Sequence, residues 1–351
     1  VAPSELQLPG RMVLNVWRLL MHLTFGAKLR SFAPQEAARE LLGRAFPKFS
    51  YQEMDQHWKG DSPTRLALLQ HVAALAALSL EVADALEIFP RAGELSRLFG
   101  MDILSGFTRG TQLRVESLLM RVAHAGGFRL LSASQEQVRA QPALECLPLV
   151  MEPSSGFYWD PVLVLDFKGM YPSLIVAHNL SFDTCLGHSR RTGLGPSCKM
   201  GVRSEPWQLG AVEELFDAGS LEDETLDPAV RLAASGALFV GPQVRKGLLP
   251  LMLAEVLQLR AETKRLAKTS PAALAKRLEH KQFALKYFAN VTYGYSSASF
   301  SGRMPCSEIA DAIVATGRRA LEEAANFIEA HWEGAKIVYG DTDSVFVQLK
   351  G

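Results

Sequence analysis

The stretch KIVYGDTDSVFV, residues 336–347, decides how we expect this chain to fold. Its two apolar halves predict a pair of antiparallel strands, joined by a turn that carries Asp341 and Asp343. A second apolar stretch, VLVL at residues 162–165, ends at Asp166 and is apolar on both faces, which predicts a central buried strand. Carboxylates that share a sheet repel one another unless a cation neutralises them. The pattern therefore predicts a divalent-metal site with oxygen ligands.

Each acidic site also has a simpler explanation when it is taken alone. Turns rich in Asp are common at protein surfaces, because Asp side chains hydrogen-bond to nearby backbone, so Asp341 and Asp343 also fit a solvated turn. A carboxylate at the end of an apolar strand needs a partner, and a structural salt bridge would satisfy Asp166. The basic segment between the two acidic sites favours the metal interpretation.

That basic segment, residues 241–286, carries ten basic and three acidic side chains. Helical periodicity predicts one helix over residues 247–268 and a second over residues 272–291, which together form an antiparallel hairpin. One face of the second helix presents a cation, two amides and an aromatic ring: Gln282, Lys286, Asn290 and Tyr293. Such a mixture is poor material for a protein core.

We interpret this face as nucleotide-binding, with Lys286 on a phosphate, Asn290 as a hydrogen-bond donor and Tyr293 against a base or sugar. Gly294 follows directly and lets flat groups approach the backbone. The neighbouring helix offers cations that would complete a phosphate clamp: Arg260 and Lys264. A solvated face is the alternative, since Lys and Gln side chains favour water.

The composition is that of a soluble globular protein. The 351 residues are 48% apolar and 21% charged, and the formal net charge is zero, so no overall basic field indicates nucleic acid. Four cysteines without a CxxC pair argue against a zinc site or a disulfide framework and favour a reducing compartment. No apolar stretch reaches the length of a membrane span, and the longest candidate, residues 67–80, predicts a buried helix.

Residues 1–104 contain no acids, His or Cys at ligand spacing and predict a structural layer of helices over 12–23, 34–42 and 65–86. Residues 187–230 are Gly-rich and then acidic, which predicts a mobile surface insertion. Its last part, residues 204–230, has eight acidic and no basic side chains.

A long amphipathic helix is predicted over residues 309–328, with Ser307 as its cap. The chain does not begin with Met and stops just after a predicted strand, so we expect a fragment of a longer protein.

Three segments resemble, in order, the polymerase motifs of family B DNA polymerases: DFKGMYPSLI at 166–175, KYFANVTYG at 286–294 and YGDTDS at 339–344. The resemblance runs from Leu8 to the end of the chain. It implies an α+β fold with an antiparallel palm sheet and a two-helix fingers subdomain, preceded by the mostly helical remains of an exonuclease-like domain. The implied parts are an exonuclease-like part over 1–105, a connecting segment over 106–160, a first palm part over 161–240, fingers over 241–297 and a second palm part over 298–351.

The same resemblance implies a DNA-directed DNA polymerase that adds deoxynucleoside triphosphates to primer-template DNA. Two Mg²⁺ ions would be held by Asp166, Asp343 and the backbone carbonyl of Phe167, with Asp341 as a weaker candidate. The residues implied at the triphosphate are cations, an amide and the backbone N–H groups of a helix start: Arg260, Lys264, Lys286, Asn290, Gly169 and Met170. The residues implied at the sugar and base are Tyr171, as a gate against a 2′-hydroxyl, Tyr293 and Gly294.

Within the family, segments such as TRGTQLRVES at 108–117 and SGRMPC at 301–306 are similar to the zeta type. That type implies translesion synthesis in the nucleus, with accessory subunits and no membrane. Proofreading members carry Tyr-x-x-x-Asp in the last exonuclease helix, whereas Leu69 and Ala73 occupy those places here, so we predict no proofreading. Gly169 stands where the family usually has Ser, which leaves the metal ligands alone and predicts a looser pocket.

Two alternatives stay open: a replicative polymerase of the delta type, and a polymerase-shaped scaffold that holds partner subunits without catalysis. The resemblance places a thumb, and a cysteine-rich tail able to hold an iron–sulfur cluster, after Gly351. The fragment alone is therefore expected to be inactive.

Overall fold

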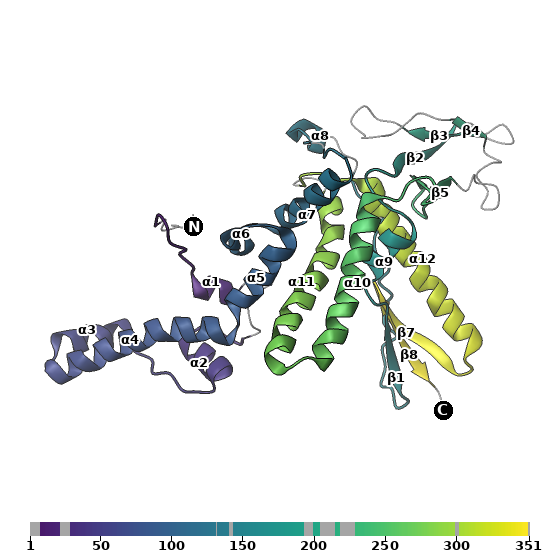
Figure 1. Cartoon of the computed structure of the whole chain (residues 1–351). Helices are drawn as coiled ribbons and strands as arrows, with labels where there is room; N and C mark the ends of the chain where they lie inside the picture. The colour runs from purple at the N-terminus through teal and green to yellow at the C-terminus, as the bar shows by residue number, and fades with distance from the viewer. Residues whose placement is uncertain are drawn as a thin grey trace. The chain divides into compact units, whose positions relative to one another are not determined.

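The computed structural model describes residues 8–21, 29–130, 132–139, 143–192, 199–203, 215–217, 229–298 and 302–349. The chain forms two compact units, Val1–Thr108 and Arg109–Gly351 (Figure 1). Helices and small antiparallel sheets both occur, which confirms the α+β fold class.

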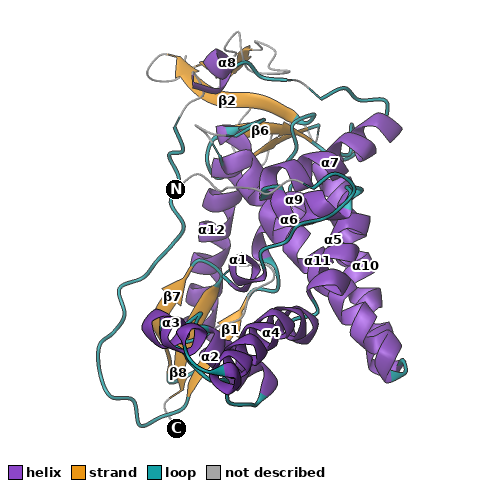
Figure 2. Ribbon diagram, turned by 90° about the vertical axis from the view of Figure 1, so that its left-hand side faces the viewer, coloured by secondary structure: helices purple, strands orange, loops and turns teal. Residues whose placement is uncertain are grey.

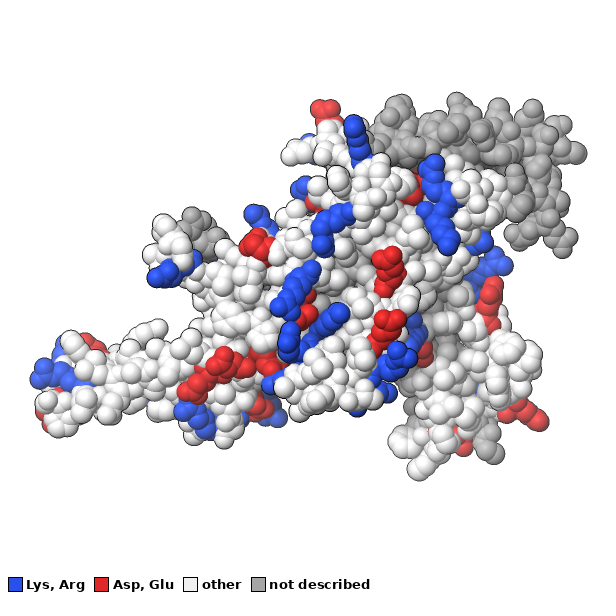
Figure 3. All heavy atoms as spheres, in the orientation of Figure 1, with Lys and Arg blue, Asp and Glu red and all other residues white. Residues whose placement is uncertain are grey.

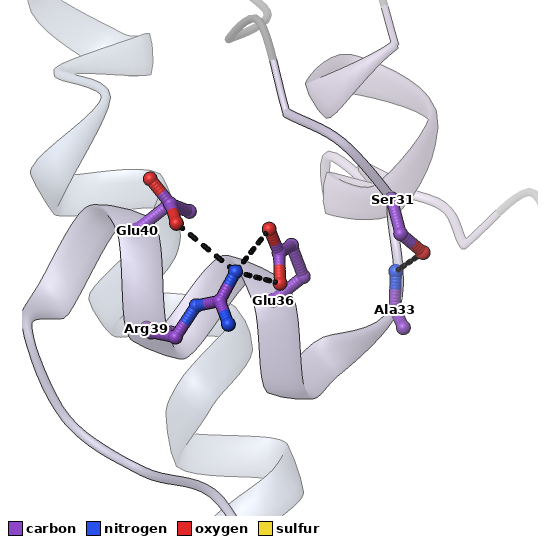
Figure 4. Close-up of polar contacts among 5 residues, drawn as sticks. All are labelled: Ser31, Ala33, Glu36, Arg39 and Glu40. Atoms are coloured by element: carbon purple, nitrogen blue, oxygen red, sulfur yellow. Dashed lines mark hydrogen bonds and ion pairs between the residues drawn. The ribbon is translucent and has the colours of Figure 1, made fainter.

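The first unit contains only helices among its described residues: α1 (Val16–Leu20), α2 (Pro34–Leu42), α3 (Tyr51–Lys59), α4 (Ser62–Ala85), α5 (Ile88–Phe99) and α6 (Ile103–Thr108). Helix α3 begins at a capping box, because Ser50 and Glu53 each accept a hydrogen bond from the other's backbone. On α2, Arg39 pairs with Glu36 at 2.8 Å and Glu40 at 3.2 Å, which joins successive turns of its exposed face (Figure 4).

Helix α4 is less buried than its sequence predicts. Its most apolar window is only 28% buried, and by length and composition it passes for a membrane span, so the prediction that no stretch reaches that length is wrong. The helix is apolar nearly all round, and α1, α2, α3 and α5 cover only part of it. Its large exposed side chains are Leu66, Leu69, Val72 and Leu80. The side that packs buries Leu68, His71 and Leu78.

The second unit contains two sheets. Strands β1 (Val162–Asp166), β8 (Ser344–Leu349) and β7 (Ala335–Asp341) form an antiparallel sheet in that order, which confirms the predicted acidic hairpin (Figure 2). The other sheet has the order β4-β3-β2-β6-β5. Its strands are β2 (Cys185–Thr192), β3 (Lys199–Arg203), β4 (Leu215–Asp217), β5 (Val230–Leu232) and β6 (Ala237–Val240).

Strand β1 is not the central buried strand that its sequence predicts. It lies at the edge of its sheet, and Leu163, Val164 and Leu165 are 46%, 57% and 45% exposed. The central strand is β8, where Val345 and Val347 are almost fully buried. An unbroken apolar run predicts a strand with a neighbouring strand on each side, but in this sheet only β8 lies between two strands.

The segment over 187–230, predicted as a mobile surface segment or insertion, contains regular structure: β3 and β4 lie within it, and β2 overlaps its start. Strand β2 is anchored by pairing with β6, whose Ala237, Leu238 and Phe239 are buried. Much of the acidic segment, residues 204–214 and 218–228, lies outside the described residues.

The helices of the second unit are α7 (Thr111–Ala125), α8 (Gln135–Arg139), α9 (Met170–Ala177), α10 (Leu248–Thr269), α11 (Ala272–Ser297) and α12 (Ser307–His331). Helices α10 and α11 form the predicted hairpin, and α9 packs against both of them and against α12. A Cβ on Gly317 of α12 would lie 3.1 Å from Met170 Sδ and 3.5 Å from Tyr171 Cε1, so this glycine permits the close approach of α9. Ser307 is the first residue of α12 and not its cap, which is Cys306.

Candidate active site

A tight turn places two of the predicted acidic residues at the end of the β7–β8 hairpin. Asp341 ends β7, and Thr342 and Asp343 form the connection. Thr342 adopts a left-handed φ of 56°, which is a strained conformation for a β-branched residue. Its hydroxyl donates to Asp341 Oδ1 at 2.8 Å, and the backbone N–H of Asp343 donates to the Asp341 carbonyl at 2.6 Å. These bonds hold the turn in one conformation.

The end of β1 is joined to this turn. Asp166 pairs with Ser344, which also pairs with Asp341 across the hairpin. The backbone N–H of Phe167 donates to the Asp343 carbonyl at 2.8 Å. Directly opposed residues of antiparallel strands have Cα atoms about 5 Å apart. The structure therefore places Asp166 and Asp341 on either side of Ser344.

The negative charges of Asp166 and Asp341 act on Asp343. Burial raises the pKa of Asp343 first, and the negative charges of Asp166 and Asp341 raise it further. Among the residues that the structure describes, no group of three His, Cys, Asp or Glu side chains is arranged to hold a metal ion. The predicted ligand set has two carboxylates and one backbone carbonyl, and such oxygen donors are the ligands that Mg²⁺ prefers. The donor chemistry and the uncompensated repulsion therefore fit a divalent cation.

An aromatic pair connects the acidic turn to the helical hairpin. The rings of Tyr171 on α9 and Tyr293 on α11 lie 4.7 Å apart at 53°. The pKa of the Tyr171 hydroxyl is raised by burial, then by Tyr293, Asp343 and Asp341. Tyr171 therefore contacts α11 through Tyr293 and lies within electrostatic reach of Asp343 and Asp341.

The polar stripe of α11 faces outward. Lys286, Asn290 and Gly294 are exposed at successive helical turns, whereas Phe288 and Tyr295 on the other side are buried. The helix continues to Ser297, six residues beyond its predicted end, so Tyr293 and Gly294 are helical. A Cβ on Gly294 would meet no atom within 4 Å, which leaves open space beside the Tyr171–Tyr293 pair. With a rise of 1.5 Å per residue, Lys286 lies about 10 Å along the axis from Tyr293.

Two further cations come from α10. Lys264 is exposed, and Arg260 is half-buried. Arg260 Nε is buried and has no hydrogen-bond partner in the described part of the chain. A buried guanidinium nitrogen without a partner is costly, and an anionic ligand would satisfy it. Figure 3 shows Lys and Arg side chains over the visible face of the α10–α11 hairpin.

The start of α9 offers backbone donors. Gly169 is the N-cap residue with a left-handed φ of 65°, and no side chain caps the helix. The first N–H groups of α9 are therefore available to an anion. Gly suits this left-handed position better than the Ser that is usual in the family. The Met170 side chain, however, is buried in the core with Leu321 and Val345, so only its backbone remains for a ligand.

Sequence reasoning missed two polar contacts near this site. Asp311 on α12 is buried and accepts hydrogen bonds from the backbone of Glu145 and Cys146. Arg114 on α7 is almost fully buried and donates to the Tyr287 hydroxyl at 3.2 Å. The signal for Asp311 was present in the sequence, because it stands among apolar residues on the inner face of an amphipathic helix.

Comparisons with known proteins identify the family of this chain. The sequence profile of DNA polymerase family B matches residues 102–351. The DNA polymerase zeta catalytic subunit of Arabidopsis thaliana is 40% identical over 99% of this chain, whereas the delta catalytic subunit of Drosophila melanogaster is 31% identical over 94%. The chain spans 18% of the length of the Arabidopsis relative and 28% of the Drosophila one.

The fold has a solved counterpart. The family B DNA polymerase of Pyrobaculum calidifontis superposes with a TM-score of 0.64, at 23% identity over 98% of this chain and 40% of that one. At this identity the match supports the fold alone. The profile match covers most of the chain, and the zeta subunit is more similar to it than the delta subunit. The chain therefore belongs to DNA polymerase family B, and within it is zeta-like.

Proposed function

We propose that this chain is the palm-and-fingers part of a DNA-directed DNA polymerase that catalyses template-dependent deoxynucleotidyl transfer. The observation that carries the proposal is the backbone pairing that joins Asp166, Asp341 and Asp343 at one end of the sheet, within electrostatic reach of Tyr171. Phosphoryl transfer requires metal ions, which the acidic oxygen ligands can hold, and positive charge on the phosphates, which the cationic helical hairpin can supply. The proposed parts are those implied by the sequence, with the palm over 161–240 and 298–351 and the fingers over 241–297.

We assign two Mg²⁺ ions to Asp166, Asp343 and the Phe167 carbonyl, where they would activate the primer 3′-hydroxyl and stabilise charge at the α-phosphate. Asp341, the weaker candidate, accepts a hydrogen bond from the Thr342 hydroxyl and would act from the edge of the metal site. The side chains of α10 and α11 orient the triphosphate and stabilise the leaving pyrophosphate: Arg260, Lys264, Lys286 and Asn290. The first N–H groups of α9 add an anion site.

Mg²⁺ should raise the melting temperature of the chain, because only the folded state brings the ligands together. Mg²⁺ at about ten times its Kd would add about 1.4 kcal/mol to the free energy of unfolding, or a few degrees. Asp166→Asn should lose this increment, whereas Glu322→Gln, on the exposed face of α12, should keep it. Thermal unfolding with Mg²⁺ or with chelator measures the difference. An equal Mg²⁺ response in Asp166→Asn would contradict the metal assignment.

Tyr171→Ala in the full-length polymerase should admit ribonucleotides, because the ring that blocks a 2′-hydroxyl is removed. One poor steric contact is worth about 1–3 kcal/mol, so discrimination between the two sugars should fall about 10- to 100-fold. Tyr171→Phe keeps the ring and should behave like the wild type. The raised pKa keeps the Tyr171 hydroxyl neutral, so selectivity should be the same at pH 7 and pH 9. Incorporation of ribonucleotides opposite a defined template measures it, and unchanged selectivity in Tyr171→Ala would contradict the gate.

We further propose translesion synthesis without proofreading, in the nucleus, with accessory subunits and without a membrane. Support comes from the similarity to zeta catalytic subunits and from Leu69 and Ala73, which cannot bind a metal. The delta-type alternative is less supported, since the delta subunit is less similar. The silent-scaffold alternative does not explain why the acidic ligands and the exposed Lys286–Asn290 stripe are both present.

A further inference from the structure

A buried carboxylate lies on α12 outside the site described above. Asp311 is 9% exposed, and its neighbours Ala310 and Ala312 are almost fully buried. A charged carboxylate in such surroundings is costly unless it accepts hydrogen bonds. Asp311 accepts from two successive backbone N–H groups, with distances of 3.1 Å to Glu145 N and 2.9 Å to Cys146 N. Such charge-assisted bonds are short and stronger than neutral ones.

The segment that Asp311 holds continues to the acidic turn. We call residues 143–154 the strap. Its backbone pairs with the outer edge of β7, on the side away from β8. Thr342 N donates to the Leu149 carbonyl at 2.8 Å, and Met151 N donates to the Gly340 carbonyl at 2.8 Å. Val150 forms a β-bridge with Asp341. The strap therefore contacts the first two residues of the turn, Asp341 and Thr342.

The strap and β7 approach closely at Gly340. A Cβ there would lie 2.7 Å from Met151 Sδ, so a larger residue would displace the Met151 side chain. The strap also stabilises the strained residue of the turn, since it accepts the N–H of Thr342. Strained backbone persists only where surrounding contacts hold it. The position of the Asp341–Asp343 turn therefore depends on the strap.

Asp311 also lies near the nucleotide side of the site. The pKa of Tyr293 is raised by burial and then by the negative charge of Asp311, so the carboxylate is close to the inner end of α11. The same residue thus holds the strap by hydrogen bonds and acts electrostatically on Tyr293. An exposed acid of the same helix, Glu322, pairs only with Arg318 one turn away, according to the described contacts.

We propose that Asp311 is a positioning residue for nucleotidyl transfer: it holds the Glu145 and Cys146 amides, and through the strap it fixes the acidic turn. The inference rests on the proposed function for the chemistry, but the coupling between Asp311 and the turn can be measured without it. Since Lys286 and Asn290 lie on a different helix and face outward, Asp311→Ala should affect nucleotide affinity much less than turnover.

Hydrogen exchange and kinetics of the full-length polymerase test this. In Asp311→Ala, peptides covering 149–154 and 338–343 should exchange about tenfold faster, as expected for lost hydrogen bonds. The turnover number should fall about 10- to 100-fold and the Mg²⁺ requirement should rise, because small displacements of catalytic groups are costly. The KM for deoxynucleotide should change much less than the turnover number. Asp311→Asn keeps one acceptor oxygen and should lie between Asp311→Ala and the wild type. Glu322→Ala should match the wild type throughout.

Two results would overturn the proposal. Either both Asp311 variants keep normal exchange at 338–343 and normal turnover, or exchange rises equally in β8, which would indicate general loosening. Absence of nucleotide incorporation by the unsubstituted full-length protein would instead contradict the proposed function, and the exchange result would still decide whether Asp311 positions the turn.

Discussion

Asp343→Asn should abolish nucleotide incorporation by the full-length polymerase. The substitution keeps the shape of the side chain but removes a charged oxygen from a site where it lies beside Asp166 and Asp341. Metal ions supply several kcal/mol of transition-state stabilisation, and about 4 kcal/mol corresponds to a loss of about 10³-fold. Single-turnover primer extension measures the rate. Near-normal turnover would remove Asp343 from the metal site.

The folded state should survive this substitution. The pKa of Asp343 is raised above 3.8, so the folded chain binds the proton more tightly than the unfolded chain. Ionisation of Asp343 therefore lowers stability as the pH rises from 3.8 through the raised pKa, and that cost persists at neutral pH. The uncharged Asn avoids it. Without Mg²⁺ at pH 7, Asp343→Asn should melt at the wild-type temperature or slightly above, which would separate lost chemistry from lost structure.

Lys286→Ala should weaken nucleotide use far more than DNA binding. Lys286 is exposed on the outer face of α11, in line with Asn290 and Gly294. No hydrogen bond or ion pair engages its ammonium group within the described residues. If it binds the triphosphate, its loss should lower kcat/KM about 10²- to 10³-fold, the usual cost of one charge-stabilising donor.

Lys281 provides the matched control for this prediction. It is the same residue type on the same helix, but it lies about 140° around the axis from Lys286. Lys281→Ala should therefore change kcat/KM for deoxynucleotide little. Steady-state kinetics and a DNA-binding titration together separate the two ligands. A large loss of DNA affinity with an unchanged KM for nucleotide would place Lys286 on the DNA.

Local patterns in the sequence predicted the parts of the site that are formed by neighbouring residues. The alternation around Asp341 and Asp343 predicted the β7–β8 hairpin, and helical spacing predicted the α10–α11 hairpin and its outward Lys286–Asn290 stripe. These features depend on interactions within about one helical turn or one strand pair, which sequence periodicity records.

Features that depend on distant segments were not predictable in this way. An apolar strand such as β1 has the same sequence whether its faces are covered or open, so its edge position depends on which strands pair with it. The exposure of one side of α4 likewise depends on which distant segments pack against the helix, and its own sequence does not record this. Asp311 was missed because its partners, Glu145 and Cys146, are more than 160 residues away and contribute backbone N–H groups that no side-chain pattern reveals.

The edge position of β1 affects how the isolated chain associates in solution. Its outer edge is unpaired among the described residues, and it presents Leu163, Val164 and Leu165 to water. Exposed apolar edges of this kind recruit strands from other copies and promote self-association. Solutions of this piece alone should therefore tend toward oligomers and aggregates as concentration rises, for a reason unrelated to catalysis.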